Sequence, residues 1–160
     1  MHDRKLTYYQ LIGILSIDSM CSGVNNIFLS MQSKRKEVIT FLEELKIILN
    51  KEDFDIDKEL TLIRKKKPGD DVRFSTQYTL LDLDYDVFDV IERLKELTVQ
   101  EYSETKIDRD DLNPPLLFVF GKDINNKLVY VKLKIKGEQE KCILCVSFHY
   151  AKDKMNFPHA

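Results

Sequence analysis

The sequence predicts an α+β fold, with a small antiparallel β-sheet and helices packed on one of its faces. Two observations carry this prediction. Residues 31–97 contain stretches in which apolar side chains recur with helical spacing. Residues 116–150 instead contain three apolar runs separated by turn-forming segments. The 160 residues, 43% of them hydrophobic, are enough for one domain with a core.

The first helix is expected soon after Met31, because apolar residues from Val38 to Leu49 follow the i, i+3, i+4, i+7 pattern. Ser33 is a candidate cap for this helix. A short strand is predicted over residues 60–64, followed by the basic run of residues 64–67 and a Pro-Gly turn. We interpret the basic run as the solvated tip of a hairpin, with phosphate binding as the alternative.

Helical spacing returns between residues 79 and 97. Residues 79–83 are predicted to form one helical turn, and residues 87–97 a longer helix with a buried apolar stripe. Asp84 or Asp86 is the expected cap of that second helix. Residues 101–113 are polar and end at two prolines, so we expect an exposed loop that leads into the sheet.

The period of two in the last strands sorts their side chains onto two faces. In the middle strand, the apolar residues from Val129 to Ile135 alternate with Tyr130, Lys132, Lys134 and Lys136. In the third strand, the alternation places Leu144, Val146 and Phe148 on one face, and Cys145, Ser147 and His149 on the other. If the apolar faces form the core, the open face presents a set of polar residues that Lys122 can join. This set is Tyr130, Lys132, Lys134 and His149. A cationic face with a tyrosine and a histidine suits a polyanion, and RNA is the natural candidate.

Composition limits the other functional classes. The net charge of −2 argues against a bulk polycation, so a nucleic-acid site must be a local patch. Three cysteines make no disulfide framework and fit a reducing cytoplasm. Cys142 and Cys145 have the spacing of a metal or redox pair, but in a strand they face opposite sides, so no metal or other cofactor is expected.

Residues 1–30 differ in character from the rest of the chain. Their weak apolar stretch, residues 6–17, is too short and too polar for a membrane helix and lacks a clean cleavage site for a secretory signal. We therefore interpret residues 1–30 as an N-terminal extension, with a mis-assigned start and a true start at Met31 as the alternative, and residues 31–160 as the single folded domain of a cytoplasmic protein.

Several segments of the chain resemble the motility quorum-sensing regulator (MqsR) toxins. The resemblance covers the chain from about Ser33 onward and is strong after Leu97, where order and spacing match as well as the residues do. The matching segments are LTVQEYSE (Leu97–Glu104), FVFGKDIN (Phe118–Asn125), VYVKLKI (Val129–Ile135), CVSFHYA (Cys145–Ala151) and MNFP (Met155–Pro158).

This resemblance implies a toxin of a type II toxin–antitoxin system with a RelE-like fold. Such toxins cut messenger RNA without a metal, using the ribose 2′-OH as nucleophile. By position in the motifs, Tyr130 and Lys132 correspond to family site residues, and His149 stands where the founding toxin has lysine. Glu104 occupies the position of a second family lysine, and a family glutamine falls near Gly121, where neighbouring Lys122 can supply charge.

The expected site therefore contains Tyr130, Lys132, His149 and Lys122 as catalytic residues. The expected RNA contacts are Lys122, Lys132, Lys134 and Tyr130. The implied partners are messenger RNA, with or without the ribosome, and a cognate antitoxin that carries a helix-turn-helix domain. Two other functions stay open: a non-catalytic RNA- or ribosome-binding module, which Glu104 favours, and a protein-interaction domain whose basic face binds an acidic partner.

Overall fold

The computed structural model describes residues 30–65, 67–112 and 114–160, so the extension assigned to residues 1–30 lies almost wholly outside it. The described chain forms one six-stranded sheet with the order β1-β3-β4-β5-β6-β2. Every strand pair is antiparallel except β2–β6, which is parallel. The strands are β1 (Ser30–Met31), β2 (Leu60–Leu62), β3 (Tyr102–Lys106), β4 (Leu117–Ile124), β5 (Lys127–Lys136) and β6 (Cys142–Tyr150). The α-helices are α2 (Arg35–Leu49), α3 (Ile56–Glu59), α4 (Thr76–Leu83) and α5 (Val87–Lys95), and η2 (Val72–Phe74) and η3 (Val99–Glu101) are 3₁₀ turns.

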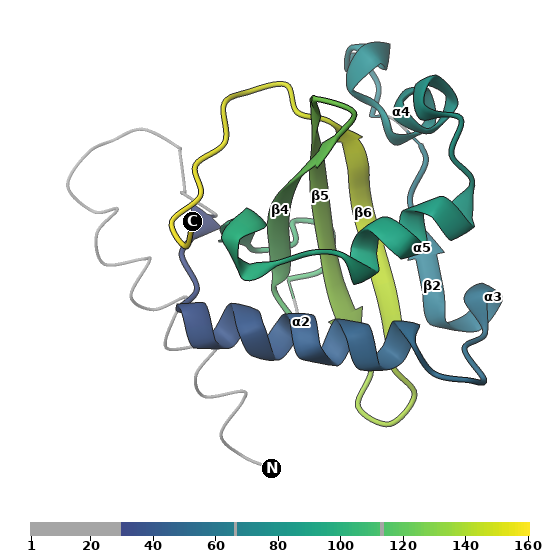
Figure 1. Cartoon of the computed structure of the whole chain (residues 1–160), viewed down its shortest axis with the longest axis vertical. Coiled ribbons are helices and arrows are strands. Elements are labelled where there is room, and N and C mark those ends of the chain that lie inside the picture. The colour runs from purple at the N-terminus through teal and green to yellow at the C-terminus, as the bar shows by residue number, and fades with distance from the viewer. Residues whose placement is uncertain (1–29, 66, 113) are drawn as a thin grey trace.

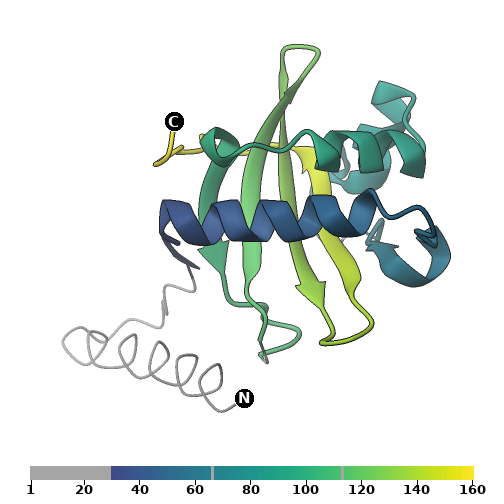
Figure 2. The ribbon, with the colours of Figure 1, turned by 60° about the horizontal axis from the view of Figure 1, so that its bottom comes forward.

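Helices α2 and α5 lie across one face of the sheet, as Figures 1 and 2 show. Their apolar stripes meet the core-facing residues of β4, β5 and β6. The ring of Phe41 stacks on that of Phe118 with centroids 4.2 Å apart, which joins α2 to β4. The predicted α+β class, with these two helices on one face, is confirmed.

The last three strands form where the sequence predicts them. Asn125 and Asn126, both with positive φ, make the tight turn between β4 and β5. The β5–β6 pairing contains an irregularity: Lys132 pairs with Ser147 but Leu133 pairs with Cys145, so Val146 is an extra residue on β6.

This bulge corrects the predicted faces of β6. Phe148 is in the core, and Ser147 and His149 are on the open face, as predicted. Before the bulge the alternation is reversed, so Cys145 lies in the core while Leu144 and Val146 line the open face. Cys142 and Cys145 still lie on opposite faces, as predicted.

Residues 102–106 form β3 rather than the predicted exposed loop. Although β3 has a polar sequence, two of its side chains, Tyr102 and Thr105, have no exposed surface. Their hydroxyls hydrogen-bond to each other at 2.7 Å. The Tyr102 hydroxyl also accepts the backbone N–H of Ser33 at 2.7 Å. Ser33 is therefore tied to β3, and the N-cap position of α2 is occupied by Lys34, which makes no side-chain capping hydrogen bond.

The strand predicted over residues 60–64 forms as β2, Leu60–Leu62, but pairs differently from the prediction. It does not turn back in a hairpin but runs parallel to β6, which it contacts from Leu60 to Leu62. Beyond β2, helix α4 covers the edge of β6: the hydroxyls of Thr76 and Thr79 accept the backbone N–H groups of Phe148 and Tyr150 at 3.2 and 3.0 Å. These bonds satisfy the backbone N–H groups at the edge of β6 on both sides of His149.

Asp86 caps α5 by accepting the backbone N–H groups of Phe88 and Asp89, which confirms one of the two predicted caps. In the part of the chain that the structure describes, no helix is long and apolar enough to cross a membrane.

Candidate functional site

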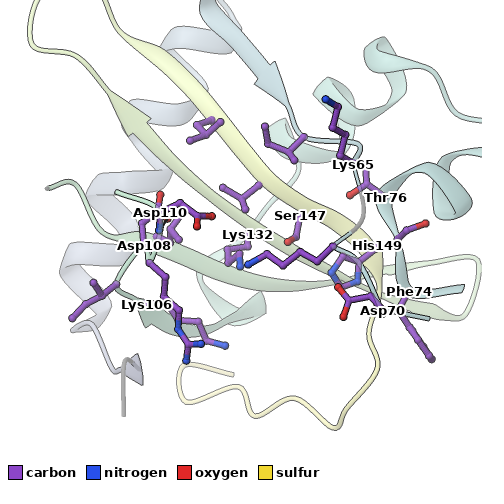
Figure 3. Close-up of a pocket in the computed structure, with 18 of the residues that line it drawn as sticks. Lys65, Asp70, Phe74, Thr76, Lys106, Asp108, Asp110, Lys132, Ser147 and His149 are labelled. Carbon is purple, nitrogen blue, oxygen red and sulfur yellow. Dashed lines mark hydrogen bonds between the residues drawn. The ribbon is translucent and has the colours of Figure 1, made fainter. Parts of the chain in front are cut away.

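A cleft of about 770 Å³ lies on the sheet face opposite α2 and α5. Its floor is made by β4, β5 and β6. Figure 3 shows Lys106, Asp108 and Asp110 on one side of Lys132, and Lys65, Asp70 and Phe74 on the other. Among residues 30–65, 67–112 and 114–160, five basic and three acidic side chains line the cleft, which gives it a positive balance although the whole chain is slightly acidic.

The rings of Tyr130 and His149 stack above the open face. Strand register places the two residues directly opposite each other, and their ring centroids are 5.2 Å apart with planes 17° from parallel. The His149 Nδ1 lies 2.9 Å from the carbonyl oxygen of Tyr150. A carbonyl can only accept, so Nδ1 carries the proton and Nε2 is left as the basic nitrogen.

His149 is held largely neutral. Burial lowers its pKa below the ordinary value of 6.5, the bond to the Tyr150 carbonyl partly offsets this, and the charge of Lys132 lowers the pKa further. A neutral imidazole with a free Nε2 can accept a proton at neutral pH.

Lys132 extends from the adjacent register pair, opposite Ser147. Among the described residues it has no hydrogen-bond or ion-pair partner within bonding distance. Burial lowers its pKa, and the charges of Lys106 and Lys67 lower it further. A half-buried, unpaired ammonium group beside other cations is a site for an anion.

Lys106 is a site residue that the sequence analysis missed. Its Nζ lies 3.5 Å from the Tyr130 hydroxyl and 2.8 Å from the carboxylate of Glu104, to which Ser30 also donates a hydrogen bond. Burial raises the pKa of Tyr130 and Lys106 opposes this in part, so the phenol keeps its proton at neutral pH. Recognising residues 102–106 as a strand would have placed Glu104 and Lys106 on one face, two positions apart.

Lys134 does not lie open on this face, contrary to the prediction. Its side chain has no exposed surface, and its Nζ forms ion pairs with Asp108 at 2.9 Å and Asp111 at 3.2 Å. The segment after β3 folds over Lys134 and brings these carboxylates with it. Lys134 is therefore committed to holding that segment and is not free to bind RNA.

Lys122 was also predicted wrongly. Antiparallel partners share a face, and Lys122 pairs with the core residue Val129, whereas Gly121 pairs with Tyr130. Lys122 thus lies on the helix-covered side, where its Nζ is 3.0 Å from Glu101 and 3.8 Å from Glu96. It can contribute neither charge nor a proton to the cleft.

Two lysines of the basic run do reach the cleft. Because β2 runs beside β6, the chain that leaves it passes along the cleft, and Lys65 and Lys67 become lining residues together with Arg109 from the opposite wall. The solvated-hairpin interpretation was wrong in its topology. The alternative, contact with phosphate, is consistent with this position.

The C-terminal segment closes one end of the open face. A Cβ on Gly121 would lie 2.8 Å from the ring of Phe157, so glycine is needed for this close approach. The tail continues to His159, whose ring stacks on Tyr102 with centroids 5.3 Å apart. The Gly121–Phe157 contact holds the tail beside Tyr130, the strand partner of Gly121.

Comparison of the chain with protein-family models, curated proteins and solved structures finds no match. The cleft contains a proton acceptor at His149 and an unpaired cation at Lys132, and the protonated phenol of Tyr130 stacks on His149 beside them.

Proposed function

We propose that this protein is a metal-independent endoribonuclease with a RelE-like fold, acting as the toxin of a type II toxin–antitoxin system of the MqsR type. The observation that carries the proposal is the pair formed by a neutral histidine and an unpaired lysine in one cationic cleft, with a protonated tyrosine stacked on the histidine. These are the groups that RNA cleavage through the ribose 2′-OH requires: a base, an acid and a cation for the phosphorane.

In the proposed reaction His149 Nε2 takes the proton of the 2′-OH, and the 2′-oxygen attacks the adjacent phosphorus. Lys132 stabilises the charge that develops on the phosphoryl oxygens. The bond from phosphorus to the 5′-oxygen breaks, and the Tyr130 hydroxyl gives its proton to that oxygen. The products are a 2′,3′-cyclic phosphate and a free 5′-OH.

Lys106 supports the acid role of Tyr130. Its Nζ donates to the Tyr130 hydroxyl and stabilises the phenolate that remains after proton transfer. Lys106 lies two residues after Glu104, which stands where the resemblance expects a lysine. The cation is thus supplied from the next outward-facing position of β3.

The direct test uses purified protein and a labelled RNA, with a chelator present to remove divalent metals. We expect cleavage that leaves a cyclic phosphate, and a decrease in rate of about 10²–10⁴-fold for His149→Ala. Lys132→Ala should weaken binding and cleavage together. The matched control is Lys36→Ala, which removes one exposed positive charge from α2, and should leave both unchanged. Full activity of His149→Ala would refute the assignment.

The test in cells is induction of the protein without an antitoxin. Growth should stop and messenger RNAs should shorten, and His149→Ala should abolish both effects. A helix-turn-helix protein encoded beside this chain should bind it and restore growth. Normal growth with intact transcripts, at confirmed expression, would refute the toxin proposal.

Non-catalytic RNA binding is the second candidate, and Glu104 favours it. The carboxylate pairs with Lys106 and neutralises part of the charge at the Tyr130 end of the cleft. In that case RNA or ribosomes should bind with an affinity that depends on Lys132 but should not be cut. If the natural partner is instead an acidic protein, the cleft should bind RNA no more tightly than it binds other polyanions.

A further inference from the structure

The cleft extends beyond the proposed reaction centre to a largely apolar floor. On the open face the register pairs run in order: Tyr130 with His149, Lys132 with Ser147, then Lys134 with Leu144. Two residues of strand separate successive side chains on one face, so this third position lies about 7 Å from Lys132. Val146, on the bulge of β6, extends the apolar surface between the second and third positions.

The floor is completed from both sides of β6. Ile63 follows β2, and its backbone N–H donates to the Cys145 carbonyl at 2.9 Å, which places it beside the bulge. Leu117 contributes from β4. Lys134 would put a charge in this floor, but its complete burial under Asp108 removes that charge from the surface. The apolar floor is therefore a consequence of both the bulge and the buried ion pair.

Basic side chains outnumber the acidic ones, Asp70, Asp108 and Asp110, in the cleft that contains this apolar floor. Lys65, Lys67 and Arg109 line the same cleft, and Lys132 lies between the floor and the Tyr130–His149 pair. A ligand that fits must have an apolar body close to anionic groups at a spacing of a few ångströms. A nucleotide unit has this character, because its base has apolar faces and its phosphate is charged.

We infer that the floor formed by Ile63, Leu117, Leu144 and Val146 binds a nucleobase of single-stranded RNA next to the phosphate held by Lys132. The inference rests on the proposed function and adds a subsite to it. In a duplex the faces of each base are stacked on its neighbours and cannot contact a protein surface. A base can therefore lie on this floor only when its strand is unpaired. The subsite accordingly selects single strands.

The test measures binding without cleavage. The probes are a 2′-deoxy pentanucleotide, which has no nucleophile, and a fully abasic strand of the same length and charge. For the wild-type protein we expect the abasic strand to bind about 5- to 10-fold more weakly, near the lower end of what a base gains on an aromatic side chain, because this floor is aliphatic. Lys132→Ala should weaken the binding of both strands by a similar factor, because both carry the phosphates.

Variants of the floor assign the effect to this surface. In Ile63→Ala/Val146→Ala the affinity ratio between the two strands should fall toward 1, while affinity for the abasic strand stays unchanged. Ile39→Ala is the matched control, since Ile39 on α2 has the same exposed fraction as Ile63, 38%. Its ratio should equal that of the wild type, and thermal melting should show that every variant is folded.

The outcomes separate the two proposals. Equal binding of both strands by the wild type, or an unchanged ratio in the floor variant, overturns the base subsite while the phosphate site stands. Failure of either strand to bind, together with no RNA cleavage, overturns the proposed function and the subsite with it.

Discussion

Replacing Lys134 with methionine tests whether the wall of the cleft is held by a buried ion pair. Methionine keeps the length of the side chain and removes its charge. The carboxylate of Asp108, whose side chain is only 10% exposed, would then be buried without its partner. Asp111 is 31% exposed and also has Lys136 at 3.5 Å, so it should suffer less.

The expected loss comes from breaking a buried pair on one side, about 3–5 kcal/mol of unfolding free energy. For a chain of this size, 1 kcal/mol shifts the melting temperature by about 2–4 °C, so Lys134→Met should lower it by roughly 6–20 °C. Thermal melts and urea unfolding at pH 7 measure both quantities. A melting temperature within about 2 °C of the wild type would refute the buried pair.

A compensated variant provides the control. Lys134→Met combined with Asp108→Asn and Asp111→Asn removes the opposed charges together, and most of the lost stability should return, because neutral groups do not carry the desolvation cost of an unpaired charge. If the triple variant is as unstable as the single one, methionine packs badly at this position and the unpaired charge is not the cause of the lost stability.

The pH dependence has a defined sign. Burial by itself raises the pKa of Asp108, but the bonds from Lys134 and from the Asp110 backbone N–H outweigh it, so the pKa lies below the ordinary 3.8. A carboxyl with a lowered folded-state pKa contributes stability above the unfolded value and loses it as pH falls through the folded one. The wild type should therefore keep this contribution at pH 7 and lose it as the pH falls below 3.8.

Three other predictions concern the core, the tail and the site. Phe148→Ala should cost about 3–5 kcal/mol in urea unfolding, because the side chain is fully buried, and a loss below about 1 kcal/mol would contradict its core position. Gly121→Ala should cost about 1–3 kcal/mol and release the tail to proteolysis, since the new methyl would meet the Phe157 ring at 2.8 Å, and an unchanged cleavage pattern would contradict that contact. The acid limb of the wild-type kcat/KM profile should lie below pH 6.5. It should move to higher pH in Lys132→Met, because the positive charge of Lys132 lowers the pKa of His149. An unmoved limb would contradict an influence of Lys132 on His149.

Local pattern was sufficient for much of the fold. Helical spacing located α2 and α5, and alternation with turn residues located β4, β5 and β6. Within β5 the period of two correctly placed Tyr130 and Lys132 on the face opposite Val129 and Val131. These features depend on residues a few positions apart, which is the range over which backbone geometry repeats.

The alignment of one strand with its neighbour could not be predicted from these local patterns. Alternation orders the faces within one strand but does not say how two strands align, and a shift of one residue moves a side chain to the other face. Lys122 was assigned to the wrong face for this reason, and the bulge at Val146 reversed the faces of Leu144 and Cys145.

The sequence by itself determined helices α2 and α5, strands β4, β5 and β6, and the Tyr130–Lys132 face. Only the tertiary structure decided which charges the cleft contains: it buries Lys134 under Asp108, brings Lys106 to Tyr130, and carries Lys65 and Lys67 past β6. The reason is that the environment of a charge is set by whatever packs against it. For Lys134 that partner is 26 residues away and for Tyr130 it is 24, both on segments whose position follows from the whole sheet.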